Sequence, residues 1–156
     1  MPLSTTVLLC VITAVSDGDS LRARCPENPT GRSTQAVKVR IANIDAQKKK
    51  KKYGRSAKAH LAQLCLKRDA LIYPVAIDSY GRLIAHVRCQ SQDAANAQLS
   101  AGLAWLYTRD GQARRRLTPL QTQAQNDHTG LWAQTAPLAP WDYRKRYGTF
   151  SSQVKQ

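Results

Sequence analysis

The sequence predicts an α+β domain that is mainly β: a five-stranded barrel of the OB type with about three helices packed on it. Short segments of alternating apolar and polar residues come first, one segment of helical spacing interrupts them, and helix-capping residues mark the second half. Five short strands with one inserted helix and two later helices suit a small closed barrel. At 156 residues the chain is long enough for one domain with a real core and too short for two.

The expected strands are segments with a period of two, which is typical of half-buried strands. Residues 7–12 are apolar but lack the basic start of a secretory signal, so they predict a first strand instead. The other four strands are expected at 21–25, 37–41, 70–75 and 83–89. Pro74 cannot donate a ladder hydrogen bond, so its strand should lie at an edge or contain a bulge.

The expected helices follow from spacing and from capping residues. Apolar residues recur at helical spacing over residues 55–67. Asp93 can cap a second helix that ends near Gly102. Thr118 starts a capping box with proline at the first helical position, so we expect a third helix to begin there and Gly130 to close it.

The chain has one expected domain, residues 1–143, followed by a basic tail, residues 144–156, which Trp141 and Tyr143 should hold against the body. Lysine and arginine number 24 against 10 acidic residues, a net charge of +14. This surplus predicts attraction to polyanions, with DNA or RNA the favoured partner. An anionic membrane surface and a merely solvated basic surface are the alternatives. No apolar run approaches the ~20 residues of a membrane-spanning helix, and we expect a monomer with no membrane partner.

Four cysteines allow two interpretations. No pair is two to four residues apart, so the spacing does not resemble a zinc site. If the first two strands form a hairpin that turns at residues 17–18, Cys10 and Cys25 are equidistant from the turn. A cross-strand disulfide would then leave Cys65 and Cys89 as the second pair. Buried free thiols fit the sequence equally well. Paired cysteines, with a signal already removed, would indicate a periplasmic or secreted protein; otherwise the protein would be cytoplasmic.

Charged residues at strand ends and turns suggest phosphodiester chemistry. Hydrolysis of a phosphodiester requires neutralised phosphate charge, a positioned water and help for the departing oxygen. Asp19 follows a tight turn, Asp45 ends a strand, Arg40 precedes Asp45 by five residues, and Arg82 follows a Tyr-Gly turn. Carboxylates hold hard divalent cations, and arginines bind phosphate oxygens. Singly, each residue is more often an ordinary turn or surface residue. In this order they predict a site.

The same residues belong to motifs that resemble the staphylococcal nuclease (thermonuclease) family over residues 11–143. The motifs are Ser16-Asp-Gly-Asp-Ser20, Val39-Arg-Ile41, Ile44-Asp-Ala46, Tyr53-Gly54, Asp78-Ser-Tyr-Gly-Arg82, Gly102-Leu-Ala-Trp105, Gly130-Leu-Trp132 and Pro140-Trp-Asp-Tyr143. The resemblance implies an OB-fold nuclease that uses calcium to cut DNA and RNA at the 5′ side of the phosphate.

The resemblance also implies roles by position. Asp19, Asp45 and the backbone carbonyl of Ala46 match the calcium ligands. Arg40 and Arg82 match the arginines that bind the phosphate.

Two tyrosines match substrate contacts: Tyr80 closely and Tyr107 only loosely. The base position departs from the pattern. Where the family has Asp-x-Pro-Glu, with the glutamate as general base, this chain has Asp-Ala-Gln-Lys ending at Lys48. The only glutamate is Glu27, which no small register shift brings into the site. A lysine is a cation at neutral pH, so Lys48 occupies the base position without supplying a base.

These observations predict a nuclease whose rate is lowered by the missing base, a group typically worth ~10²–10⁴ in rate. One alternative is an inactive pseudonuclease. In that case the ammonium of Lys48 pairs with Asp19 or Asp45, excludes calcium and leaves a nucleic-acid-binding module. A second alternative is a basic structural protein whose acidic and arginine side chains lie far apart.

Overall fold

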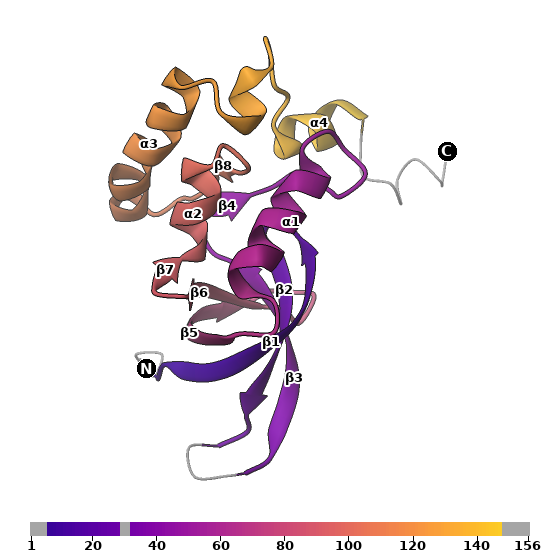
Figure 1. Ribbon diagram of the computed structural model, residues 1–156, viewed down its shortest axis with the longest axis vertical. Helices are drawn as coiled ribbons and strands as arrows, with labels where there is room; N and C mark the ends of the chain where they lie inside the picture. The colour runs from indigo at the N-terminus through magenta and orange to yellow at the C-terminus, as the bar shows by residue number, and fades with distance from the viewer. Residues whose placement is uncertain (1–5, 29–31, 148–156) are drawn as a thin grey trace.

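A closed five-stranded barrel forms the body of the protein, as the sequence predicts. The computed structural model describes residues 6–28 and 32–147. The barrel strands are β1 (Leu8–Asp17), β2 (Ser20–Pro26), β3 (Thr34–Ile41), β5 (Asp69–Ile77) and β6 (Leu83–Cys89). They follow the order β3-β2-β1-β5-β6, and a parallel pairing of β3 with β6 closes the barrel (Figure 1).

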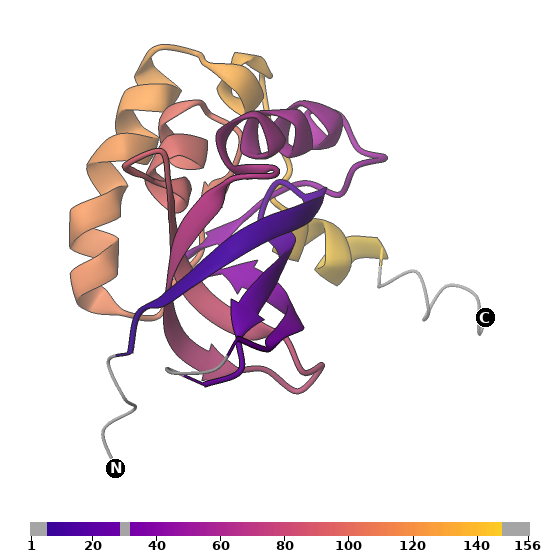
Figure 2. The same ribbon diagram turned by 60° about the horizontal axis from the view of Figure 1, so that its bottom comes forward.

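Helices gather at one end of this barrel, while the β2–β3 hairpin extends from the other (Figure 1). The helical elements are α1 (Gly54–Cys65), α2 (Ala94–Ser100), α3 (Gly111–Asn126), the 3₁₀ turn η1 (Gly130–Ala133) and α4 (Pro140–Tyr147). Three short strands, β4 (Ile44–Asp45), β7 (Gln92–Asp93) and β8 (Trp105–Leu106), connect them. Figures 1 and 2 both show α3 and α4 on opposite sides of the barrel. Among the described residues, no helix combines the length and apolar character needed to cross a bilayer.

The barrel core follows from the alternation in the strands. In β2, Leu21, Ala23 and Cys25 are buried and the arginines between them are exposed. Leu61 of α1 is buried in the same core. Pro74 lies at a register shift between β5 and β6, which confirms the predicted bulge.

The predicted start of the third helix was wrong. Helix α3 begins at Gly111 because the carboxylate of Asp110 accepts a hydrogen bond from the backbone N–H of Gln112. Pro119 therefore lies inside the helix, and the Thr118 hydroxyl donates to the carbonyl of Arg114 instead of capping a new start. The helix ends at Asn126, four residues before the expected closing glycine.

The other helix ends agree more closely. Asp93 caps α2 by accepting from the Asn96 N–H, as predicted, although the helix ends at Ser100. The expected boundary between domain and tail, residues 143 and 144, lies inside α4. Residues 148–156 of the expected tail are outside the described residues.

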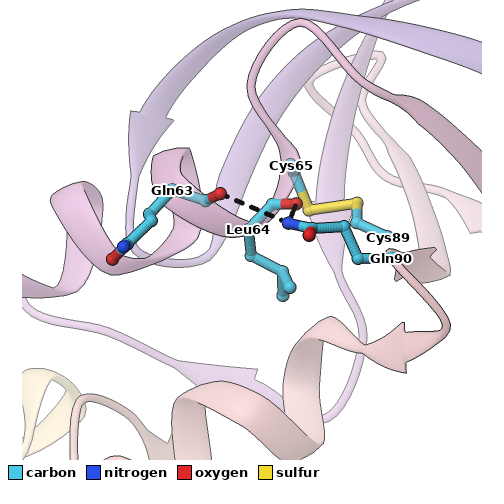
Figure 3. The surroundings of a disulfide bond; sticks show 5 residues. All are labelled: Gln63, Leu64, Cys65, Cys89 and Gln90. Atoms are coloured by element: carbon cyan, nitrogen blue, oxygen red, sulfur yellow. Dashed lines mark hydrogen bonds between the residues drawn. A yellow bond between two sulfur atoms is a disulfide. The ribbon is translucent and has the colours of Figure 1, made fainter.

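Both cysteine pairs form disulfides, Cys10–Cys25 and Cys65–Cys89. The first joins β1 to β2 across the hairpin, and the second joins the last residue of α1 to the last residue of β6 (Figure 3). Beside the second disulfide, the Gln90 side chain donates to the carbonyl of Leu64 over 2.9 Å. The sequence left disulfides and free thiols open, and the structure shows disulfides at both pairs.

Candidate active site

Asp19 lies in the two-residue turn between β1 and β2 and is only 3% exposed. The turn fits tightly against α1, since a Cβ atom on Gly18 would lie 2.5 Å from the Cβ of Ala57. The Ser20 hydroxyl donates to Oδ1 of Asp19 and the Ala46 N–H donates to Oδ2, each over 2.8 Å. The fold therefore holds this carboxylate in one orientation.

Asp45 approaches the same point from strand β4. It is 5% exposed and pairs across to Trp105 of β8. Nη2 of Arg40 lies 3.6 Å from Oδ2 of Asp19 and 3.6 Å from Oδ1 of Asp45. The two carboxylates thus share one guanidinium group, and the structure brings these three predicted residues together.

The two acids affect each other electrostatically. Burial raises the pKa of the Asp45 carboxyl above its ordinary value of 3.8, and the negative charge of Asp19 raises it further. Arg40 and Arg144 act in the opposite direction and do not cancel the effect. Ionisation of Asp45 is therefore less favourable in this buried position beside Asp19 than in water, even with two arginines nearby.

Arg144 is a further member of this cluster. Its Nη2 donates to Oδ2 of Asp45 over 3.2 Å, across 99 positions of sequence. The sequence did not predict this contact with Asp45, because Arg144 falls in the expected basic tail. The only signal was the expectation that Trp141 and Tyr143 hold this segment against the body.

Contacts on both sides of Arg144 hold α4 at the site. The Trp141 ring stacks on Tyr107 with centroids 5.1 Å apart and planes at 20°. Nζ of Lys51 lies 3.7 Å above the Tyr143 ring. The Gln47 side chain also donates to the carbonyl of Leu138 over 3.0 Å. The C-terminal helix is therefore fixed to the loop that follows Asp45.

Arg82 has a different setting, in the loop between β5 and β6. Its Nε donates to Oδ2 of Asp78 over 2.8 Å, and Oδ1 of Asp78 accepts the backbone N–H groups of Tyr80 and Arg82. Partial burial raises the pKa of Asp78, but these hydrogen bonds and the Arg82 charge outweigh it, so the pKa lies below 3.8. Arg82 immediately precedes β6, where Ile84 pairs with Arg40, so alternation places Arg82 and Arg40 on one face. Among the described residues, Arg82 forms its ion pair with Asp78 and not with the buried acids.

The two tyrosines flank the cluster in different ways. Tyr80 is exposed in the Asp78 loop, with the Arg82 guanidinium 5.5 Å from its ring centroid. Tyr107 follows β8, and its N–H donates to the carbonyl of Asn43, just before β4. Tyr107 is thus near Asp45 along the backbone, whereas Tyr80 accompanies Arg82.

Lys48 points away from the acid pair. Its side chain is 68% exposed, and Nζ lies 3.7 Å from Oδ2 of Asp17. The alternative in which Lys48 pairs with Asp19 or Asp45 is therefore not what the structure shows. The backbone here is packed closely against α1, since a Cβ on Gly54 would lie 1.8 Å from the Lys48 carbonyl oxygen.

Gln98 links the turn that carries Asp19 to helix α1. The sequence pattern did not single it out. It is fully buried, and its Nε2 donates to the carbonyls of Gly18 and Ala57 over 2.7 and 2.9 Å. Its Oε1 is 2.6 Å from Nδ1 of His60. A glutamine on the apolar face of a predicted helix would have been the signal, because a buried amide requires partners.

The donor set suits a hard divalent cation. Two carboxylates, Asp19 and Asp45, and the Ala46 carbonyl are all oxygen ligands, which calcium prefers. Oδ2 of Asp19 and Oδ1 of Asp45 each lie 3.6 Å from Nη2 of Arg40. The distance between these two oxygens is therefore at most twice that value. Within the described residues no three His, Cys, Asp or Glu side chains cluster as a metal site. Calcium takes 6–8 oxygens, so water or substrate would have to complete its shell.

The structure defines a class of protein: an OB-type barrel that carries two buried carboxylates beside arginine side chains. Comparison with known families agrees. The family described as staphylococcal nuclease homologue matches residues 38–134. The chain belongs to this family.

Similar proteins carry related names. The rice (Oryza sativa subsp. japonica) protein named probable staphylococcal-like nuclease CAN1 is 34% identical over 126 residues, which are 78% of this chain and 38% of that protein. An uncharacterized endonuclease of Haemophilus influenzae is 29% identical over 153 residues, 93% of this chain and 82% of that protein. An uncharacterized endonuclease of Escherichia coli O157:H7 is 30% identical over 138 residues, which are 86% of this chain and 84% of that protein. The chain thus spans little more than a third of the rice protein and most of the bacterial ones.

Proposed function

We propose that this chain hydrolyses phosphodiester bonds of DNA or RNA, with calcium held by Asp19, Asp45 and the Ala46 carbonyl. The observation that carries the proposal is the convergence of two buried carboxylates, from separate elements, on one nitrogen of Arg40. The nuclease and endonuclease names of similar proteins support the same reaction.

Each residue has a role that fits its setting. Arg40 and Arg82 bind the oxygens of the scissile phosphate, since a guanidinium matches phosphate geometry. Asp78 orients the Arg82 side chain through Nε and leaves the terminal nitrogens directed away from that contact. Tyr80 and Tyr107 contact the nucleic acid beside the phosphate. A bound calcium would supply charge neutralisation and a more acidic water.

We expect a slow reaction, because Lys48 stands where the family has its general base. Lys48 is exposed and paired with Asp17, so it neither accepts a proton nor displaces the cation. Water attack then depends on the cation site and on phosphate binding alone, at a cost of ~10²–10⁴ in rate.

The second candidate is a nucleic-acid-binding module without turnover. The net charge of +14 and the exposed lysines after Asp45 favour it. Lysine and arginine side chains hold the backbone by releasing counterions, whether or not hydrolysis follows.

One assay separates the two candidates. The purified chain is incubated with single-stranded DNA over a range of calcium concentrations and in chelator, alongside Arg82→Ala. Arg115→Ala is the matched control, because Arg115 is an exposed arginine of α3. Calcium-dependent cleavage that is lost in Arg82→Ala and kept in Arg115→Ala supports the nuclease. Salt-sensitive binding that ignores chelator and leaves the DNA intact supports the module.

The two disulfides suggest where the protein acts. Disulfides persist in oxidising compartments, so we place the protein in the periplasm or outside the cell. Alkylation of the protein in situ, followed by mass spectrometry, should find all four cysteines blocked until a reductant is added. Free thiols in the native location would contradict this placement.

A further inference from the structure

Arg144 reaches the proposed cation site from outside the matched family region. Residues 38–134 match the family, whereas Arg144 lies in α4. Its Nη2 donates to Oδ2 of Asp45, while Oδ1 of the same carboxylate faces Nη2 of Arg40 at 3.6 Å. Each oxygen of Asp45 therefore has its own guanidinium partner.

In this arrangement the positive charge of Arg144 would repel a cation bound at Asp45. A calcium ion ligated by Asp45 would lie near the oxygen that Arg144 contacts, and two positive charges at one buried carboxylate repel each other. The two negative charges of the acid pair attract either cation. Arg144 and calcium are therefore competitors for Asp45.

The two arginines of Asp45 differ in their freedom to leave. Arg40 is 16% exposed and its Nη1 also donates to the carbonyl of Ile41 over 2.8 Å. The Arg144 side chain is 40% exposed. Arg144 can therefore turn toward solvent, whereas Arg40 is held within the barrel.

The helix keeps a released Arg144 close to the site. Trp141 stacks on Tyr107, and Tyr143 lies under Lys51, so α4 stays in place when one side chain moves. A guanidinium at this rim is well placed for a phosphate of the nucleic acid strand, which it binds through paired N–H groups.

We propose that Arg144 is an exchangeable cation of the site: it pairs with Asp45 in the absence of metal and moves to a phosphate of the nucleic acid when calcium binds. The inference rests on the proposed calcium-dependent function. It assigns Arg144 two opposite effects, weaker calcium binding and stronger nucleic acid binding.

The test compares Arg144→Gln with Arg146→Gln. Arg146 is an exposed arginine two residues further along the same helix, so both variants lose one positive charge from α4. Calcium affinity is measured by titration calorimetry without nucleic acid, and KM is measured for single-stranded DNA at saturating calcium. We expect Arg144→Gln to bind calcium about 3–10-fold more tightly and to show a KM about 5–10-fold higher, the size of one charge-assisted hydrogen bond. Arg146→Gln should change both by less than about twofold. Arg144→Lys, which keeps the charge, should keep calcium affinity close to that of the unaltered chain.

Each other outcome overturns the inference. Weaker calcium binding in Arg144→Gln would make Arg144 a support for Asp45 rather than a competitor. Equal effects in Arg144→Gln and Arg146→Gln would mean that Arg144 acts only through the general positive charge of α4. Unchanged calcium affinity together with a raised KM in Arg144→Gln would show that Arg144 binds nucleic acid without competing with calcium. Absence of calcium binding in the unaltered chain would overturn the calcium site of the proposed function together with this inference, whereas the other results leave that site intact.

Discussion

The protein has two aspartate–arginine arrangements that differ in almost every physical respect. Asp45 is buried, faces a second carboxylate and has a pKa raised by burial and by that neighbour. Asp78 lies in a surface loop, and hydrogen bonds from the Arg82 and Tyr80 backbone and from the Arg82 side chain outweigh partial burial and lower its pKa. Asp45 ionises less readily than a free aspartate, and Asp78 ionises more readily.

The difference indicates distinct tasks. A satisfied carboxylate such as Asp78 is a structural element, and what it presents is the Arg82 guanidinium. Two carboxylates held close together in a buried position are stabilised by a bound cation. The proposed site therefore has two separate parts. We call Arg82 with Asp78 the phosphate-binding arm and Asp19 with Asp45 the cation-binding arm, and substitutions should affect the two arms differently.

The largest effect should come from Asp19→Asn. Asparagine can still accept the Ala46 N–H, and the Ser20 hydroxyl can rotate to accept, so the turn keeps its shape. One ligand charge is lost, and we expect calcium-dependent cleavage of single-stranded DNA to fall at least ~100-fold. Asp127→Asn, at the exposed residue that follows α3, is the control and should stay near the original rate. A loss below about tenfold in Asp19→Asn would show that the acid pair is not the cation arm.

Lys48→Glu should change the rate in the other direction, because it adds a carboxylate to the loop that follows Asp45. We expect cleavage to rise about 10–100-fold, within the usual range of a general base. Lys49→Glu makes the same charge change one residue further on, and Lys48→Gln only removes the ion pair with Asp17. Neither control should accelerate the reaction. If Lys48→Glu matches its controls, the alignment of Lys48 with the base position is wrong.

The parts of the site that the sequence predicted are those fixed by local structure. Asp19 follows a tight turn, and Arg40 and Asp45 belong to one strand and the segment after it, so alternation and turn chemistry locate them. Their convergence requires only the barrel pairing of β2 with β3, in which Ser20 lies opposite Arg40.

What the sequence could not predict depends on contacts between distant segments. The position of Arg144 follows from ring packing between α4 and the residue after β8, which no local pattern encodes. The start of α3 was mispredicted because two capping signals compete, and Asp110 caps the helix in place of Thr118. Lys48 pairs with Asp17 and not with the buried acids, a contact between distant segments that no local pattern encodes.

Asp78→Asn should have a smaller effect than Asp19→Asn. The amide oxygen can still accept the two backbone N–H groups, so the loop persists, but the charged contact that orients Arg82 is lost. We expect kcat/KM for single-stranded DNA to fall about tenfold, while calcium affinity measured by calorimetry stays unchanged. A change in calcium affinity in this variant would mean that the two arms are not separate.

The smallest effect, on stability, distinguishes the two carboxylates by sign. In chelator, the folded state holds the Asp45 proton more tightly than the unfolded state, so Asp45 lowers the free energy of unfolding as pH rises from 3.8 through its raised folded pKa. Asp78 has a folded pKa below 3.8, so its contribution to stability is present above that pH and is lost as pH falls through the folded pKa.

Urea denaturation from pH 3 to pH 7 should test both signs. As the pH is raised, the original chain should lose stability relative to Asp45→Asn and gain stability relative to Asp78→Asn. Calcium should flatten the first trend, because a bound cation favours the ionised carboxylate, and should leave the second unchanged. Two trends of the same sign would mean that folding does not raise the pKa of Asp45, and the contrast between the two carboxylates would be lost.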